Sequence, residues 1–235
     1  MKGFYEIYKK RKKCFEKLKK ILRLFIKKSE FIYLGEKIED GSIIISNHEG
    51  ASSPLTLELY SEFYFRFWAT YEMNSGLKSV YKYLSEIYFH KKKHWNIHLS
   101  RIFCVIAAPV VNLFYKGLDL ISTYPDGRLL NTIKESIKVL ENNKNLVIYP
   151  ENSNKGYFKA LEMFHPGISL FLEQCLKKNI NAKVYVSYLK KEERKYIIDK
   201  PIYIKELLDM HLSREELASY LCDKCNNLIN IEISN

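Results

Sequence analysis

Two residues with acid–base side chains each lie just past a run of apolar residues that is typical of a strand buried on both faces. His48 follows residues 42–46, which read Ser-Ile-Ile-Ile-Ser, and Glu151 follows 146–149. In open α/β sheets the reactive groups gather at the carboxyl ends of strands, so we expect His48 and Glu151 to share one crevice. An imidazole there can serve as a general base, and a carboxylate can orient it.

The elements that position these residues alternate between strands and helices. A third strand is predicted at 182–188, and the apolar spacing predicts helices between and after the strands, at 53–62, 75–87, 129–141, 166–177 and 213–225. This alternation indicates an α/β fold: a single layered domain with a mostly parallel or mixed central sheet flanked by helices.

Positive charge is concentrated at the N-terminus. The chain has 235 residues and a net charge of +11, and residues 1–28 contain 12 Lys and Arg opposed only by Glu6 and Glu16. Apolar residues in 9–28 recur every three to four positions, which predicts a basic amphipathic helix. We therefore divide the chain into this helix, 1–28, and an α/β domain, 29–235.

A helix that is apolar on one side and cationic on the other suits an anionic membrane surface, because each basic residue near it contributes about 1 kcal/mol. The alternative is a helix packed on the domain with a solvated basic side. We expect a peripheral or monotopic protein on the cytoplasmic face of the membrane, and no nucleic-acid partner. The uncharged run 102–115 is shorter than the roughly 20 residues that cross a bilayer, so we expect a buried, monotopic or acyl-contacting helix there.

Neither the cysteines nor the histidines predict a metal site. Cys222 and Cys225 have no second Cys or His pair at zinc-site spacing. His90, His94 and His98 would share a helical face, but the three lysines at 91–93 make a poor cation site. We expect no metal and no cofactor, and we expect the basic histidine segment to dock a membrane or an acidic acyl carrier.

Three blocks of the sequence together resemble the glycerolipid acyltransferase family typified by 1-acylglycerol-3-phosphate acyltransferase. The first family block is a strand leading into Asn-His, four residues, Asp and Pro, and 47–54 here reads Asn-His-Glu-Gly-Ala-Ser-Ser-Pro. His48 and Pro54 match that block, whereas Ser53 stands where the family has Asp. In the family this Asp holds the second nitrogen of the imidazole.

The other two blocks follow in the family's order. The third block, an apolar strand before Phe-Pro-Glu-Gly-Thr-Arg, resembles 146–155, in which Glu151 matches and Asn152 replaces Gly. Residues 121–128 are similar to the second block, and Arg128 is the nearest substitute for an Arg that contacts the acceptor phosphate. The likeness covers residues 30 to 205.

The resemblance implies an acyltransferase of phospholipid biosynthesis. It would move a fatty acyl group from acyl-CoA or an acyl carrier protein to the hydroxyl of a lysophospholipid or related glycerolipid. His48 would be the general base, with Ser53 and Glu151 as the other catalytic residues. Substrate binding would fall to amides, hydroxyls and cations near the blocks, namely Asn47, Arg128, Asn152, Ser153 and Lys155.

The missing Asp leaves three hypotheses open. The chain is a slower acyltransferase that uses Ser53, an acyltransferase that uses another carboxylate, or a non-catalytic lipid-binding pseudoenzyme of the same fold. The Ser53 hydroxyl can accept a hydrogen bond but has no charge to stabilise an imidazolium. In the Ser-His-Asp triad, replacing the Asp by Asn lowers turnover by about four orders of magnitude.

Overall fold

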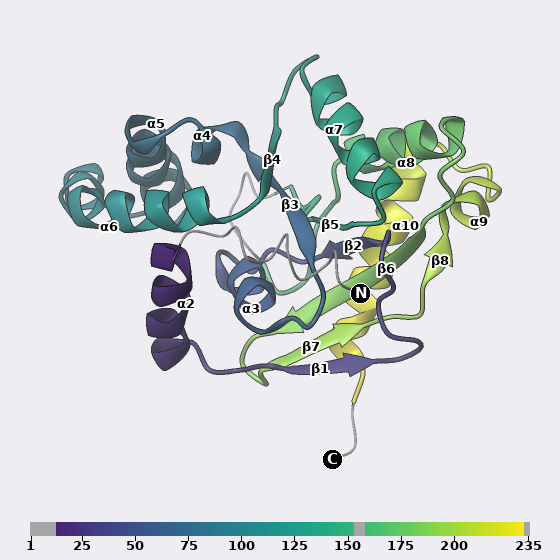
Figure 1. Ribbon diagram of the computed structural model, residues 1–235, viewed down its shortest axis with the longest axis horizontal. Helices are drawn as coiled ribbons and strands as arrows, with labels where there is room; N and C mark the ends of the chain where they lie inside the picture. Colours follow the sequence, from purple (N-terminus) through teal and green to yellow (C-terminus); the bar gives the residue numbers. More distant parts are fainter. Residues whose placement is uncertain (1–12, 153–157, 233–235) are drawn as a thin grey trace. The chain divides into compact units, whose positions relative to one another are not determined.

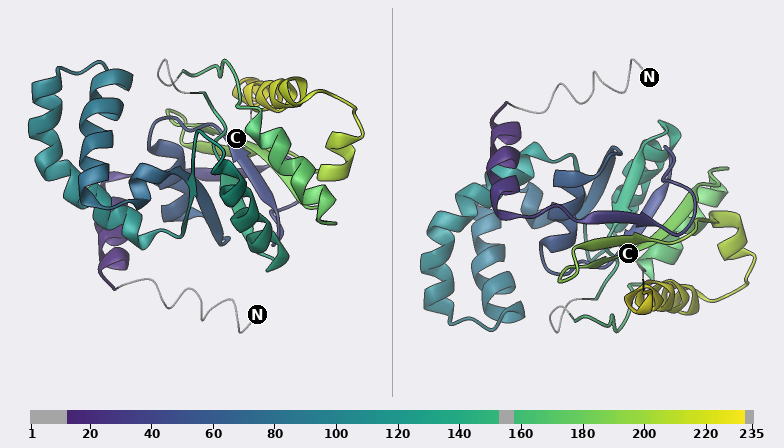
Figure 2. Two further views of the ribbon diagram at one scale, coloured as in Figure 1. Left: turned by 90° about the horizontal axis from the view of Figure 1, so that it is seen from above. Right: turned by 90° about the horizontal axis from the view of Figure 1, so that it is seen from below.

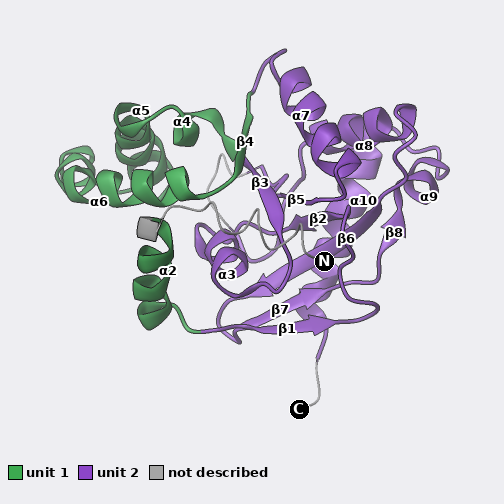
Figure 3. Ribbon diagram, in the orientation of Figure 1, with its two compact units in different colours: residues 1–27, 69–124 green, residues 28–68, 125–235 purple. Residues whose placement is uncertain are grey.

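The computed structural model describes residues 13–152 and 158–232, and the chain divides into two compact units (Figure 3). The helical unit contains residues 1–27 and 69–124, and the sheet unit contains 28–68 and 125–235. From the sequence we expected one α/β domain over 29–235; in the structure, residues 69–124 of that range group with the N-terminal helix.

The sheet unit is built around a mixed sheet whose strand order is β1-β7-β6-β2-β5-β3 (Figure 1). β2 is central and runs parallel to both of its neighbours, β5 and β6, while β7 and β8 are antiparallel to β6. The expected α/β architecture is therefore confirmed. The strands are β1 Glu30–Tyr33, β2 Ile43–Ser46, β3 Phe65–Thr70, β5 Asn145–Ile148, β6 Lys183–Lys190, β7 Lys195–Ile198 and β8 Ile202–Tyr203.

The central strands form where the sequence is most continuously apolar. Every residue of β2 and of β5 is buried, and Ile45 lies opposite Ile148 in the parallel ladder between them. Branched side chains pack well on both faces of such a strand. The strands β1 and β7 are short and lack both a long apolar run and a clear alternation of apolar and polar residues. We predicted neither as a separate strand.

Helices flank this sheet, and Figure 2 shows them from two further sides. α10 packs against α8 and β6, and α7 packs against β5. Ser213 and Glu216 form a capping box that starts α10, since each side chain accepts from the other's backbone N–H. The helices are α3 Ser52–Tyr60, α7 Leu129–Glu141, α8 Gly167–Lys177, α9 Ile204–Leu208 and α10 Arg214–Asn227, followed by the 3-10 turn Leu228–Asn230.

The helical unit contains one strand and several helices. The Thr123 hydroxyl on β4 donates to the Ala69 carbonyl within this unit at 3.1 Å. The longest helix, α6, packs against α5 and the π-helix η1. The elements are α2 Lys13–Phe25, α4 Tyr71–Asn74, α5 Leu77–Lys82, η1 Tyr83–Lys92, α6 Ile97–Gly117 and β4 Leu120–Thr123.

The three spaced histidines do not lie on one helix. η1 ends at Lys92 and α6 begins at Ile97, with His94 in the turn at a φ of 56°. His90 Nδ1 lies 2.8 Å from the Trp95 carbonyl oxygen. Within residues 13–152 and 158–232, no group of three or more His, Cys, Asp or Glu is placed to hold a metal ion.

The part of the N-terminal helix that is described, α2, packs on α6 through Phe15. That side chain is 1% exposed, and its ring centroid lies 5.3 Å from that of Phe114. A Cβ at Gly117 would collide with the Phe15 ring, so only glycine allows this close approach. The same helix leaves Ile21, Leu24 and Phe25 exposed.

We predict that Phe15→Ala destabilises the protein by about 3–5 kcal/mol, because it removes a fully buried ring and leaves a cavity against α6. Phe25→Ala is the matched control on the same helix, and we expect it to change stability by less than about 0.5 kcal/mol because Phe25 is 79% exposed. Urea unfolding followed by circular dichroism measures both values. Equal effects of the two substitutions would contradict this packing.

Candidate active site

His48 and Glu151 lie side by side at the carboxyl ends of adjacent parallel strands. β2 and β5 are in register through Ile45 and Ile148, so the residues that follow them emerge at the same edge of the sheet. The Glu151 carboxylate accepts a hydrogen bond from the His48 backbone N–H at 3.1 Å. Glu151 is buried, and through this bond it holds the backbone of His48.

The chain turns sharply after His48. Glu49 and Gly50 both have positive φ, 46° and 65°, in the left-handed region that glycine tolerates best. The turn ends in α3, where the Ser52 N–H donates to the Glu49 carbonyl and the Ser53 N–H to that of His48. The half-buried imidazole therefore lies at the corner between a strand and a helix.

Aromatic rings line one side of the imidazole. The His48 and Tyr149 ring centroids are 5.0 Å apart with the planes at 64°, and Tyr149 stacks on Phe67 at 6.0 Å. This edge-to-face geometry is favourable for aromatic pairs. Part of the imidazole consequently contacts carbon instead of water.

Asn47 holds the site to β6. Its side-chain oxygen accepts from the Leu189 N–H at 2.7 Å, and its side-chain nitrogen donates to the Leu189 carbonyl at 3.3 Å. The main-chain ladder between β2 and β6 ends at Ser46 and Ser187, and the Asn47 amide continues it by one step. Asn47 was predicted to bind substrate, and the structure gives its buried amide this structural contact.

Ser53, at the position of the family Asp, belongs to a buried hydroxyl cluster formed by Ser46, Ser53 and Tyr196. Ser53 is 0% exposed, and its Oγ lies 3.1 Å from the Tyr196 hydroxyl and 3.4 Å from Ser46 Oγ. Ser46 Oγ and the Tyr196 hydroxyl are 2.7 Å apart. Burial raises the pKa of Tyr196, so the phenol stays neutral.

Tyr196 was not predicted from the sequence because it lies 143 residues from Ser53, on a strand of only four residues between β1 and β6. No motif marks it. The pairing of β7 with β6, which brings Tyr196 opposite Leu189, would have to be known first.

Two of the residues expected to hold phosphate, Arg128 and Asn152, form hydrogen bonds within the protein. The Arg128 guanidinium donates to both carboxylate oxygens of Asp126, and these hydrogen bonds lower the pKa of Asp126 to about 2. The Asn152 N–H donates to the Met163 carbonyl at 3.0 Å. Ser153 and Lys155 lie outside the described residues.

The C-terminal cysteine pair lies in the core. Cys225 Sγ donates to the Ser187 carbonyl at 3.2 Å, and Cys222 is also buried. Burial raises the pKa of both thiols, to about 11 for Cys222, so both are neutral thiols at neutral pH.

Comparison with known proteins shows the fold. No family model matches the sequence, and no curated protein matches it. Among solved structures, the chain is similar to the 1-acyl-sn-glycerophosphate (LPA) acyltransferase PlsC from Thermotoga maritima, with a TM-score of 0.50 and 15% sequence identity. The similarity covers 92% of this chain and 78% of that chain. The protein therefore has the fold of a glycerolipid acyltransferase, as the sequence resemblance implied.

We predict that Asn47→Asp destabilises the protein by about 3 kcal/mol at neutral pH, because a buried carboxylate would face the Leu189 carbonyl without a proton to donate. The loss should shrink as the pH falls, since the introduced carboxyl, once protonated, can donate again. Unfolding free energies measured from pH 7 to pH 4 test both effects.

Asn131→Asp is the control, because Asn131 is exposed on α7. If the loss of unfolding free energy in Asn47→Asp does not depend on pH, or if Asn131→Asp loses as much, the hydrogen bonds between the Asn47 amide and the Leu189 backbone do not contribute to stability.

Proposed function

We propose that this protein transfers a fatty acyl group from a thioester donor, acyl-CoA or acyl carrier protein, to the hydroxyl of a lysophospholipid or related glycerolipid, with His48 as the general base. The observation that carries the proposal is the placement of His48 beside Glu151 at adjacent strand ends, in the fold of an acyltransferase. Fold alone does not give function, so the proposal rests on this pair.

In the proposed reaction the neutral imidazole of His48 takes the proton of the acceptor hydroxyl. The hydroxyl oxygen attacks the thioester carbonyl and forms a tetrahedral oxyanion. Collapse of this intermediate breaks the carbon–sulfur bond, and the imidazolium returns the proton to the leaving thiolate. An ester and a free thiol result, and His48 is neutral again.

The position that carries Asp in the family has no carboxylate here to stabilise the imidazolium formed in this step, because it is Ser53. The Ser53 hydroxyl lies in the neutral hydroxyl cluster, and the Glu151 carboxylate accepts from the His48 backbone. Such a base is effective when a carboxylate accepts a hydrogen bond from the second imidazole nitrogen and stabilises the imidazolium. We therefore propose slow turnover, in which Glu151 holds the His48 backbone in place and its negative charge favours the nearby imidazolium.

Acceptor recognition would use the guanidinium of Arg128, near the second block, and polar side chains near the third block. Arg128 can bind a phosphate in place of the Asp126 carboxylate, because a guanidinium can donate two parallel hydrogen bonds to the oxygens of either group. Asn152 follows Glu151 directly and would lie near the same group. We place the protein as a peripheral or monotopic protein on the cytoplasmic face of the membrane, where such acceptors reside.

The second candidate is a lipid-binding protein without activity. It is favoured by one observation: Ser53 is fully buried among hydroxyl groups, so the position that supplies a charge in the family supplies none here. Such a protein would bind lysophospholipid and leave the thioester intact.

We predict that purified protein forms labelled diacyl product from radiolabelled acyl-CoA, or labelled acyl carrier protein, and a panel of lyso acceptors. His48→Ala should lower the initial rate by at least about a hundredfold, because the general base is removed. His48→Ala should still bind the acceptor, as isothermal titration calorimetry would show. Identical rates for wild type and variant would refute catalysis and leave the lipid-binding candidate.

We predict that Ser53→Asp raises turnover by about tenfold or more, because a carboxylate at this position can stabilise the imidazolium, with the hydroxyls of Tyr196 and Ser46 as donors to it. The measurement is kcat at saturating acceptor. Ser52→Asp is the matched control, since it adds the same charge one residue earlier.

The gain in Ser53→Asp should disappear when His48→Ala is added. A gain that persists without His48, or that Ser52→Asp reproduces, would show that charge alone is responsible.

A further inference from the structure

The outer face of α6 exposes a continuous stripe of large apolar side chains. Ile102 is 70% exposed and Ile106 is 77% exposed. The exposed apolar residues recur at helical spacing along the helix, at Leu99, Ile102, Phe103, Val105, Ile106, Val110 and Leu113. A soluble helix turns such a face toward the core, and an exposed patch of this kind marks a contact surface.

The inner face of α6 has the opposite composition. Its buried positions include Ser100, Cys104 and Ala108, whose small side chains pack toward Val80 and Leu84 of the neighbouring helices. Over its first three turns α6 therefore buries small residues and exposes large ones, whereas near its end Phe114 is buried against Phe15. Small residues at helix contacts and large apolar residues outside are the arrangement of helices that face lipid.

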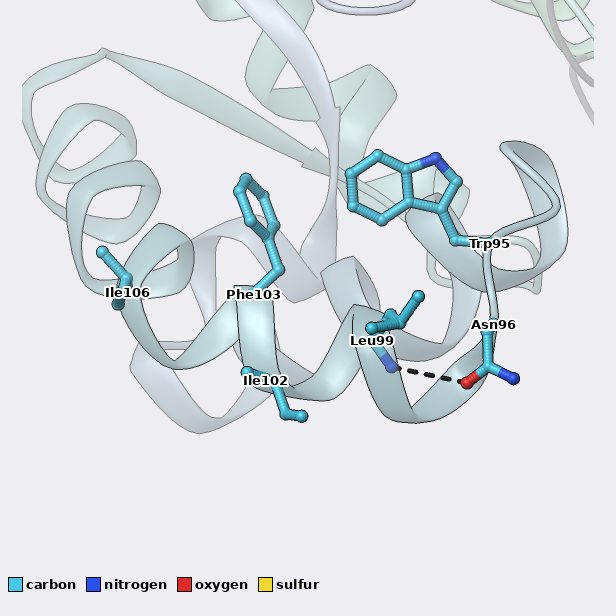
Figure 4. A pocket seen from close by; sticks show the side chains of 6 residues that line it. All are labelled: Trp95, Asn96, Leu99, Ile102, Phe103 and Ile106. Carbon is cyan, nitrogen blue, oxygen red and sulfur yellow. Dashed lines mark hydrogen bonds between the residues drawn. The ribbon is translucent and has the colours of Figure 1, made fainter.

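The first half of the stripe is open and aromatic. Trp95, Leu99, Ile102, Phe103 and Ile106, together with Asn96, line an open groove of about 650 Å³ (Figure 4). The Trp95 and Phe103 ring centroids are 5.5 Å apart, and the Asn96 side chain caps the start of the helix. Tryptophan with an apolar body and a polar edge is enriched where a membrane meets water.

Positive charge flanks this stripe within the helical unit. Lys91 and Lys93 are exposed just before α6, Arg101 is exposed on its first turns, and Lys116 is exposed at its end. Glu86, 3.7 Å from Arg101, opposes one of these charges. An apolar surface with a cationic rim is complementary to an anionic phospholipid surface.

We propose that α6 lies in the plane of an anionic phospholipid bilayer, with the stripe from Leu99 to Leu113 inserted among the acyl chains and the basic residues at the headgroups. The inference rests on the proposed function in one respect, since a bilayer is where a lysophospholipid acceptor would be found. From the sequence, membrane contact was expected of the basic segment 1–28, and a buried, monotopic or acyl-contacting helix was expected at 102–115; the exposed stripe of α6 favours the monotopic alternative for that second segment.

α6 is also, among the described residues, the one helix long and apolar enough to cross a membrane, by length and composition only. Its partners α5 and η1 argue for the in-plane orientation. They pack along it and carry Lys78, Lys82 and Glu86, which a crossing α6 would draw into the hydrocarbon. With α6 in the plane, α5 and η1 remain outside the hydrocarbon, because Val80 and Leu84 pack with Cys104 and Ala108 on the face of α6 opposite the stripe.

The first test is sedimentation of the full chain with vesicles of phosphatidylcholine and phosphatidylglycerol. The double variant Ile102→Gln/Ile106→Gln should bind at least about a hundredfold more weakly than wild type, with its unfolding midpoint unchanged because both side chains are exposed. Leu130→Gln is the matched control: Leu130 is 54% exposed on α7 of the sheet unit, and its substitution should leave vesicle binding unchanged.

Equal binding by the double variant would overturn the proposal, as would failure of wild type to bind these vesicles. The alternative is that the stripe is a contact between two copies of the chain. In that case analytical ultracentrifugation would show a wild-type dimer that the double variant abolishes, and wild type would not bind vesicles. Vesicle binding needs no turnover, so His48→Ala should bind like wild type. A protein that binds vesicles but transfers no acyl group would refute the enzyme and leave this inference standing.

A second test measures depth. The chain has two tryptophans, so Trp68→Phe leaves Trp95 as a single probe for quenching by lipids brominated at different acyl carbons. Ile106→Trp in a Trp68→Phe/Trp95→Phe background reports the middle of α6. An in-plane helix gives both probes the same shallow quenching profile. A deep profile for the mid-helix probe and a shallow one for Trp95 would show that α6 crosses the membrane.

Discussion

The hydrogen bond between the His48 backbone N–H and the Glu151 carboxylate connects two strand ends that are 103 residues apart in sequence. Its formation requires β2 and β5 to be neighbours in parallel, and the burial of both strands secures that arrangement. A carboxylate hydrogen-bonded to a main-chain amide in a buried setting is a strong restraint. The turn at Glu49 and Gly50 and the start of α3 come directly after the residue whose backbone this bond holds.

Much of this arrangement could be predicted from sequence because the informative segments are local. The apolar runs of β2 and β5 and the spacing in α7 and α10 reveal their element type without knowledge of their neighbours. Placing His48 beside Glu151 needed one further rule, that carboxyl ends of parallel strands gather at one edge.

Other features depend on the pairing of strands that are distant in sequence, which no local sequence pattern predicts. Tyr196 reaches Ser53 because β7 folds back on β6, and Asn47 reaches Leu189 because the β2–β6 ladder ends where it does. The grouping of residues 69–124 with the N-terminal helix also depends on contacts between distant residues, among them those of Phe15 with Phe114 and Gly117. The exposure of the α6 stripe could not be inferred either, because periodicity shows that a helix has two faces and not which one is covered.

The reversed composition of α6 has a consequence for how the protein tolerates change over evolutionary time. A packed interface constrains volume, because a methylene added at Ala108 or Cys104 would push against neighbouring helices. A fluid hydrocarbon constrains only polarity, because acyl chains rearrange around any apolar shape. The two faces of one helix would therefore diverge under different rules. Leucine, isoleucine, valine and phenylalanine would exchange freely on the outer face, while side-chain size would stay nearly invariant on the inner one.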